Sequence, residues 1–212
     1  MIIAVDGPAA SGKGTIARAL ARHYGLPHLD TGMLYRAVGA SLIERGLDPA
    51  NADAALSACD FEDALCDDPM LRTEAVGRVA SIVSAHPAVR KALFERQRRF
   101  AEQPGGAVLD GRDIGTVIAP DADAKIFVKA TPTIRAQRRQ QDLRGQGNFA
   151  SLDKVLADIR ARDERDTKRT DAPLRQAADA ALLDTSFLSI DAAVQRAIAL
   201  VEAQTTARAE TR

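Results

Sequence analysis

Tryptophan is absent from the 212-residue sequence, and aromatic residues make up only 4% of it. This scarcity argues against stacked aromatic rings that would hold single-stranded nucleic acid. A basic excess is lacking as well, because 29 Lys and Arg balance 29 Asp and Glu. General nucleic-acid binders usually carry such an excess. The apolar runs also fall short of the roughly 18 residues that span a bilayer. We therefore expect neither a nucleic-acid partner nor a membrane partner.

Cysteine and histidine are scarce too. The two cysteines, Cys59 and Cys66, are too few for a disulfide framework, and together with the three histidines they show no zinc-ligand spacing. No basic residue precedes the first apolar stretch, as it would in a secretory signal. We therefore expect a cytoplasmic protein. Hydrophobic residues at 46% and charged residues at 27% are typical of a globular chain.

Short apolar runs alternate with amphipathic stretches along the chain. The expected strands are residues 2–5, 27–29, 107–109, 125–128 and 180–183. After a first helix that ends before Gly25, the expected helices are 72–100, 131–143, 151–165 and 190–204. The first run lacks polar alternation, as strands buried on both faces do. This pattern predicts an α/β fold with a five-stranded parallel sheet flanked by helices.

One domain is expected, with two interruptions of its core. The core is predicted to comprise about 1–29, 101–143 and 170–204. Residues 30–100 contain no convincing core strand, so they are expected to form a helical insertion. Residues 144–169 begin at a glycine-containing break and are rich in arginine, which suggests a mobile lid. Residues 205–212 lack apolar periodicity and are expected to fray.

The clearest motif is a glycine-rich loop between the first strand and the first helix. It consists of Gly7, Pro8, Ala9, Ala10, Ser11, Gly12, Lys13, Gly14 and Thr15. Glycines let several backbone N–H groups face one point, and the start of the helix adds partial positive charge. Lys13 can reach the β- and γ-phosphates of a nucleotide as a point charge. The strand–loop–helix context therefore predicts an ATP-binding P-loop.

Gly14 stands where the usual P-loop carries a serine or threonine that ligates Mg²⁺, and Thr15 comes one residue later. The phosphate cradle is unaffected by this departure. Because Mg²⁺ gives up water reluctantly, we expect it to be held by the nucleotide's oxygens and by water, with no direct protein ligand.

Arginines recur where a second phosphate could bind. They are Arg36, Arg90, Arg112, Arg162, Arg165 and Arg169. Ligands of open α/β sheets bind beyond the carboxyl ends of the strands, which is where Asp110, Arg112 and Asp113 follow a predicted strand. Planar guanidinium forks match phosphate oxygens. A lid that carries arginines and closes on ATP would align the phosphates and exclude water, as in-line phosphoryl transfer requires.

Six segments resemble the bacterial cytidylate kinases, a family of P-loop nucleoside monophosphate kinases. They are GPAASGKGT at 7–15, DTGMLYR at 30–36, SIVSAHPAVR at 81–90, DGRDIGT at 110–116, RDERDTKR at 162–169 and the run 172–186. The first is shared by many kinases, whereas the fourth and fifth together are far more specific to this family, which also has glycine after the P-loop lysine. The resemblance implies a P-loop kinase fold with a helical nucleotide-monophosphate lobe and a short arginine-rich lid.

The resemblance also implies ATP or dATP as donor, CMP or dCMP as acceptor, and Mg²⁺ with the ATP. Thr31 and Arg36 would hold the acceptor's phosphate and ribose side. The residues implied around cytosine are Ser81, Arg90, Arg112 and Asp113, and those implied at the acceptor sugar and the transferred phosphoryl group are Arg162, Asp166 and Arg169. Lys13, Arg162 and Arg169 would be catalytic. Many bacterial members carry a small antiparallel strand insertion, whereas the corresponding segment 56–72 is short here and lacks strand alternation.

Other interpretations remain open at this point. Asp30 and Asp110 also suit helix N-caps or turns. The charges of 158–169 suit a solvated helix face with pairs such as Glu164 and Lys168. For the whole chain, the alternatives to a monomeric CMP kinase are another small-acceptor P-loop kinase, shikimate-like or thymidylate-like, and a non-catalytic nucleotide-binding switch. The arginine-rich lid and the lack of an Asn-Lys-x-Asp motif argue against a switch.

Overall fold

The computed structural model describes residues 1–210, and the chain forms two compact units. Unit 1 comprises Met1–Leu29 and the chain from Ala101 onward, and unit 2 comprises Asp30–Phe100. The limits of unit 2 coincide with the range 30–100 expected for the helical insertion. Within the described residues, no helix combines the length and the apolarity needed to cross a membrane.

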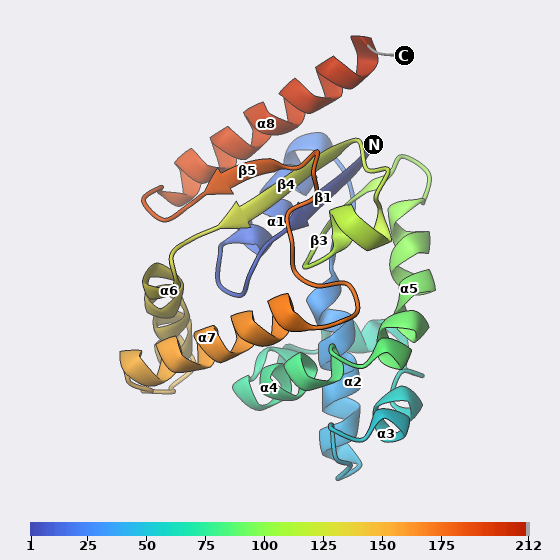
Figure 1. Cartoon of the computed structure of the whole chain (residues 1–212), viewed down its shortest axis with the longest axis vertical. Helices are drawn as coiled ribbons and strands as arrows, with labels where there is room; N and C mark the ends of the chain where they lie inside the picture. Colours follow the sequence, from blue (N-terminus) through green and yellow to red (C-terminus); the bar gives the residue numbers. More distant parts are fainter. Residues whose placement is uncertain (211–212) are drawn as a thin grey trace. The chain divides into compact units, whose positions relative to one another are not determined.

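Unit 1 is built on a five-stranded sheet (Figure 1). The strands are β1 (Ile2–Asp6), β2 (His28–Asp30), β3 (Ala107–Gly111), β4 (Ala124–Lys129) and β5 (Ala181–Asp184), in the order β2-β3-β1-β4-β5. β1 runs parallel to both β3 and β4, and β4 runs parallel to β5. The five predicted strands and the α/β class are thereby confirmed. Each strand begins and ends within about two residues of its expected position.

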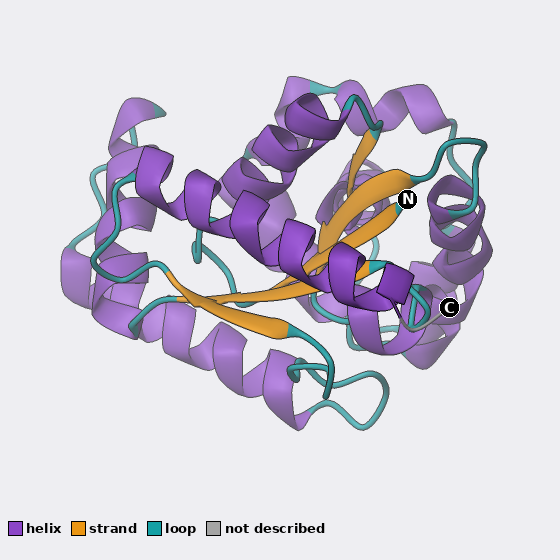
Figure 2. Cartoon of the chain, turned by 90° about the horizontal axis from the view of Figure 1, so that it is seen from above, coloured by secondary structure: helices purple, strands orange, loops and turns teal. Residues whose placement is uncertain are grey.

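The core of unit 1 lies between the sheet and two helices, α1 (Lys13–Tyr24) and α8 (Ile190–Glu210). Ile16 and Leu20 of α1 and Ala197 and Val201 of α8 belong to one buried cluster with apolar residues of the strands, Ile3 among them. Figure 2 shows the strands as one twisted sheet with the C-terminal helix lying across it. Burial of both strand faces explains the unbroken apolar runs of the sequence.

The strand register brings the chemistry-bearing loops to one edge of the sheet. Asp6, the last residue of β1, lies opposite Gly111 of β3 and Phe127 of β4. The glycine-rich loop after β1 and the polar segment after β3 therefore leave the sheet side by side. This edge is where ligands bind in open parallel sheets.

Two further helices of unit 1 follow β4. α6 (Pro132–Gly145) and α7 (Leu152–Lys168) pack against each other through Ala136, Leu143, Val155 and Ile159. The side chains of Thr131 and Ser151 cap the two helices by accepting backbone N–H groups of the first turn. α7 extends to Lys168, three residues beyond its predicted end.

Unit 2 is helical. Its elements are α2 (Thr31–Glu44), α3 (Ala52–Ser57), two 3₁₀ helices (Asp63–Asp67 and Pro69–Arg72), α4 (Glu74–Val83) and α5 (Pro87–Ala101), the last residue of which belongs to unit 1. Met33 and Ala37 of α2 pack with Leu71 and Val76 in a buried cluster. The Asp30 side chain accepts the backbone N–H of Gly32, so it caps α2, as one interpretation of the sequence anticipated.

The single helix expected over 72–100 is wrong, because the structure contains two. α4 ends at Val83, and α5 begins at Pro87. Proline disfavours helical backbone in the residue before it but is well suited to the first position of a helix. Continuous apolar spacing on both sides of Pro87 concealed this break.

The expectation that residues 205–212 fray is corrected as far as Glu210, where α8 ends. The Thr205 hydroxyl donates to the Val201 carbonyl, and the Arg208 guanidinium donates to the carbonyls of Asp121 and Ala122. These polar contacts hold the last turns of α8 in place, although those turns present no apolar face to the sheet. Residues 211–212 lie outside the described part of the chain.

Candidate active site

The glycine-rich loop passes over the end of β4 and leads into α1. A Cβ atom on Gly7 would overlap the backbone carbonyl oxygen of Val128, so only glycine allows this close approach. Gly12 has φ +91° and is the N-cap of α1. Ala10 has φ +58°, a left-handed conformation that costs a residue with a Cβ about 1–2 kcal/mol. The loop thus places the N-terminus of α1, whose helix dipole favours an anion, directly after the end of β1.

Lys13 is the first residue of α1, and its ammonium Nζ lies 3.9 Å from Oδ2 of Asp110 at the end of β3. The side chain of Lys13 is 14% exposed, and that of Asp110 is 2% exposed. One interpretation of the sequence made Asp110 a helix N-cap, whereas the structure places it within β3. Instead, it supplies a buried negative charge beside the P-loop lysine.

Asp6 connects the P-loop strand to the polar segment after β3. Its Oδ1 accepts the backbone N–H of Ile114 at 2.9 Å, and its Oδ2 accepts that of Gly115 at 2.8 Å. Burial raises the pKa of Asp6 to about 7; the two N–H donors oppose this shift, and the nearby Asp113 carboxylate adds to it. The bonds fix the start of the short π-helix Ile114–Ile118, and hence the position of Asp113 just before it.

This pKa predicts an unusual dependence of stability on pH. Folded Asp6 retains its proton to about pH 7, whereas the unfolded side chain loses it near pH 4. Its contribution to the free energy of unfolding is therefore complete below about pH 4 and is lost as the pH rises through 7. Between about pH 4 and pH 7, the free energy of unfolding of wild type should fall by on the order of 4 kcal/mol relative to that of Asp6→Asn. This value follows from about 1.4 kcal/mol per unit of pKa difference between the folded and unfolded states.

Urea denaturation of wild type and Asp6→Asn at several pH values measures this difference. The exposed Asp158 of α7 provides a surface control in the variant Asp158→Asn. A difference between wild type and Asp6→Asn that does not change with pH would contradict the prediction.

Two ion pairs join the segment after β3 to the end of α7. The Arg112 Nε donates to Asp166 Oδ2 at 2.7 Å, and Arg169 Nη2 lies 3.6 Å from Asp113 Oδ1. Burial alone would raise the pKa of Asp166, but the charges of Arg112, Arg162 and Arg169 outweigh it and hold that pKa below its usual range. Asp166 is therefore an ionised carboxylate among three guanidinium groups. The sequence anticipated these five residues as a site but not their pairing.

The neighbouring charges of α7 behave as a solvated surface. Lys168 Nζ donates to Glu164 Oε1 at 2.7 Å, and both side chains are mostly exposed. This is the i,i+4 pair that the alternative interpretation of the segment predicted. α7 therefore carries both a solvated face and, at Asp166, a face that contacts Arg112.

Arg135, at the start of α6, was not singled out from the sequence. Its guanidinium donates to both carboxylate oxygens of Asp163 on α7, at 2.8 and 2.6 Å. It also donates to the carbonyl of Ala130 at 2.9 Å and to the P-loop carbonyl of Ala9 at 3.3 Å. The side chain is only 4% exposed. A buried bidentate pair thus fixes α7 directly to the P-loop.

Replacing the Arg135 guanidinium by a lysine ammonium should remove the bidentate pair with Asp163 and uncouple α7 from the P-loop. We expect Arg135→Lys to lower kcat for phosphoryl transfer about tenfold, because small displacements of positioning groups are costly in this chemistry. Steady-state kinetics measure the effect, with the exposed Arg144 of the same helix as control in Arg144→Lys. A kcat within twofold of wild type for Arg135→Lys would show that the fork does not position α7.

Arg138, one turn along α6, also contacts the P-loop. Its guanidinium donates to the Ser11 carbonyl at 3.3 Å. It also donates to the hydroxyl of Thr185 at 3.0 Å and to the carbonyl of Thr185 at 2.6 Å. The Thr185 hydroxyl in turn donates to the Ser11 carbonyl at 2.8 Å. The P-loop backbone is therefore held by two arginines of α6. Their i,i+3 spacing places both on one face of the predicted helix 131–143, but nothing in the sequence indicates their partners.

In unit 2, Arg36 of α2 donates to the carbonyls of Leu71 and Thr73, the latter at 3.2 Å. The Arg90 guanidinium lies 5.9 Å from the ring centroid of Tyr35. Thr31 begins α2, Ser81 lies on α4, and both are buried, as is Arg90. Unit 2 therefore holds these four predicted acceptor residues on a helical framework with little exposure.

Among the described residues, no group of three or more His, Cys, Asp and Glu side chains could hold a metal ion. Asp110 lies next to Lys13, and Asp6 accepts two backbone N–H groups, so neither is arranged as part of a ligand cluster.

A P-loop at the edge of a parallel sheet, with paired arginines from the segment after β3 and from α7, defines a P-loop kinase fold. A solved structure of an uncharacterized protein from Eubacterium ventriosum shares the fold, with a TM-score of 0.56 at 14% identity over 95% of this chain and 98% of that one.

Comparison of sequences is more specific. The cytidylate kinase family model matches residues 3–203. The cytidylate kinase of Xanthobacter autotrophicus is 57% identical over 208 residues, which cover 98% of this chain and all of that protein. That of a Bradyrhizobium species is 58% identical over 204 residues, which cover 96% of each. The chain belongs to the cytidylate kinase family.

Proposed function

We propose that this protein transfers the γ-phosphoryl group of ATP to CMP or dCMP, producing ADP and CDP or dCDP by direct in-line displacement. The observation that carries this function is the pairing of Arg112 and Asp113 with Asp166 and Arg169 at the sheet edge that also bears the P-loop. Family membership, carried by relatives named cytidylate kinase, supports CMP as the acceptor.

The P-loop holds the donor. Backbone N–H groups at the start of α1 bind the β- and γ-phosphates, and Lys13 compensates the charge that develops between them. Mg²⁺ enters with ATP as part of the substrate, held by phosphate oxygens and water, and it neutralises charge on the phosphates. Rigid support of the loop by Arg135 and Arg138 keeps these donors in place before ATP binds.

Arginines of α7 act on the phosphoryl group in transit. Arg162 and Arg169 stabilise negative charge on the transferred group and on the acceptor phosphate, and Asp166 meets the acceptor sugar. We assign residues 144–169 the role of a lid that closes over the phosphates and excludes water, so that the acceptor attacks and solvent does not. Before the lid closes, the ion pairs of Asp166 with Arg112 and of Arg169 with Asp113 compensate the charges of these two lid residues.

Acceptor recognition is assigned to the residues that the family resemblance implies. Thr31 and Arg36 would bind the phosphate and ribose side, and Ser81, Arg90, Arg112 and Asp113 would surround the base. Cytosine offers a carbonyl oxygen and a ring nitrogen as acceptors and an exocyclic amine as donor, which suit guanidinium and carboxylate groups. Uracil would present an acceptor to Asp113, and a buried mismatch of this kind discriminates strongly. We further propose that the enzyme works as a cytoplasmic monomer.

Release of ADP tests this function directly. With purified protein and MgATP, CMP and dCMP should stimulate ADP formation far more than UMP, AMP or dTMP. Equal use of UMP and CMP would contradict the proposed recognition of the base. A preference for dTMP or for shikimate would favour the alternative kinases, and ATP binding without stimulation by any acceptor would indicate a switch.

A further inference from the structure

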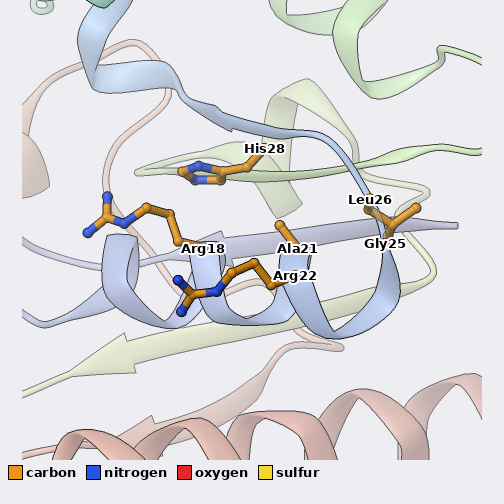
Figure 3. A pocket seen from close by; sticks show the side chains of 6 residues that line it. All are labelled: Arg18, Ala21, Arg22, Gly25, Leu26 and His28. Atoms are coloured by element: carbon orange, nitrogen blue, oxygen red, sulfur yellow. The ribbon is translucent and has the colours of Figure 1, made fainter.

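A cavity of about 420 Å³ lies beside α1 and the start of β2 (Figure 3). Its lining residues are Arg18, Ala21, Arg22, Gly25, Leu26 and His28, all of which belong to unit 1. None of them is a residue of the P-loop or one of those assigned to the acceptor. The volume falls within the range of pockets that hold small molecules. The cavity therefore offers space for a ligand outside the site already described.

The side chains around this cavity carry positive charge. Arg18 and Arg22 are four residues apart on α1, so both leave the same face of the helix. Figure 3 shows the two guanidinium groups and the His28 ring extending toward the same side. Neither arginine forms a hydrogen bond or an ion pair with another of residues 1–210, and no Asp or Glu of that range lines the cavity. Two neighbouring guanidinium charges therefore lack a negative partner in the described part of the chain.

The helix itself accounts for only one of these charges. Arg22 lies in the last turn of α1, where the final carbonyls of the helix attract a cation. Arg18 lies one turn earlier, where this attraction has faded, and like charges four residues apart repel each other. α7 places opposite charges at the same spacing, in Glu164 and Lys168. A bound anion would supply the compensation that α1 lacks.

The guanidinium groups and the histidine ring together indicate the chemistry of the ligand. Planar guanidinium forks match the oxygens of a phosphate group. The Nε2 of His28 lies 2.8 Å from the Asp110 carboxylate, which accepts hydrogen bonds, so Nε2 carries the proton of a neutral ring. Nδ1, the other ring nitrogen, is then an acceptor that suits a hydroxyl group. Ala21, Gly25 and Leu26 add small or apolar surface that suits a carbon skeleton.

We propose that this cavity binds the phosphate group of a small hydroxylated ester, such as a sugar phosphate. Arg18 and Arg22 bind the phosphate oxygens, and His28 accepts a hydrogen bond from a hydroxyl of the organic part through Nδ1. The site is separate from those of the donor and the acceptor, so it goes beyond the proposed function. Free phosphate shares the charge of the ester but lacks the carbon skeleton, and the titrations below distinguish the two.

Ribose 5-phosphate and inorganic phosphate are suitable probes. Calorimetric titration is carried out with the imido analogue of ATP and Mg²⁺ at saturation, so that the P-loop is occupied. Wild type should bind ribose 5-phosphate with a dissociation constant on the order of 1 mM or below. It should bind inorganic phosphate about threefold more weakly or worse, because the hydroxyl contact is lost. Absence of binding at about 10 mM ribose 5-phosphate would overturn the proposal. Equal affinity for both probes would overturn the ester as the ligand.

The double variant Arg18→Gln with Arg22→Gln removes both guanidinium charges from the cavity. Its dissociation constant for ribose 5-phosphate should rise about tenfold or more, because charge-assisted hydrogen bonds are the strong ones. The matched control is Arg175→Gln with Arg196→Gln, which removes two exposed arginines from elsewhere in unit 1. Its dissociation constant should stay within about twofold of wild type, because distant surface charges are screened by salt. An equal loss of binding in the control would mean that net charge alone attracts the probe, and it would overturn the proposal.

Backbone amide shifts in NMR spectra locate the bound probe. In wild type, ribose 5-phosphate should shift the amide signals of Ala21 and Gly25, and in the Arg18→Gln, Arg22→Gln variant it should not. Shifts confined to residues 7–15 would place the probe at the P-loop and overturn the proposal. Neither measurement requires phosphorylation of CMP. A protein that binds the probe in this cavity but does not phosphorylate CMP would therefore contradict the proposed function alone.

Discussion

Lys13→Ala is expected to reduce kcat for CMP phosphorylation by about 10³-fold or more. The lysine is the only side chain of the loop that carries charge, and electrostatic stabilisers of a transition state commonly contribute this much. The backbone N–H groups of α1 remain, so binding of the donor should weaken but persist. Steady-state formation of ADP at saturating CMP measures the change.

The exposed Lys154 on α7 provides a matched control, because Lys154→Ala removes the same charge from the surface. Its kcat should stay within twofold of wild type. The unfolding midpoint of Lys13→Ala must also be measured, since Asp110 loses a neighbouring cation. A folded Lys13→Ala protein with near-normal turnover would refute the role of the lysine.

Asp113→Ala is expected to raise the KM for CMP by about 10²-fold and to reduce the preference for CMP over UMP. Removing one member of a buried polar pair leaves its partner unsatisfied and removes the acceptor for the base amine. Because Asp113 also lies 3.6 Å from Arg169, kcat should fall as well, while the KM for ATP stays near that of wild type.

Kinetics with CMP and UMP at fixed MgATP measure both effects. The control is Asp158→Ala, which removes an exposed carboxylate from α7 and should leave acceptor selectivity unchanged. Unchanged selectivity in Asp113→Ala would show that this carboxylate does not contact the base.

The sheet and the P-loop were predictable from local features. Strands buried on both faces produce unbroken apolar runs, and the loop between Asp6 and Lys13 has glycines where the backbone approaches β4 or adopts positive φ. Local features did not reveal the break between α4 and α5 at Pro87, because the apolar pattern continues across it. They also did not reveal that α8 continues to Glu210, because polar contacts such as that of Arg208 hold its last turns.

The residues that support the site were less predictable. Arg135 and His28 have ordinary neighbours in the sequence, and their partners Asp163 and Asp110 lie far along the chain. Asp6 was recognised only as the end of a strand, although its burial raises its pKa against the opposing effect of the N–H groups of Ile114 and Gly115. Contacts between distant segments of this kind carry no periodic signal.

The sequence by itself determined the α/β class and the glycine-rich loop, and it predicted the charged residues of a nucleotide kinase, because propensity, glycine geometry and charge act over a few neighbouring residues. Only the tertiary structure decided which charges meet: Arg112 with Asp166, Asp113 with Arg169, Arg135 with Asp163, and His28 with Asp110. The strand order and the packing of α6 on α7 set these pairs, and such long-range geometry depends on how the whole of unit 1 buries its apolar surface.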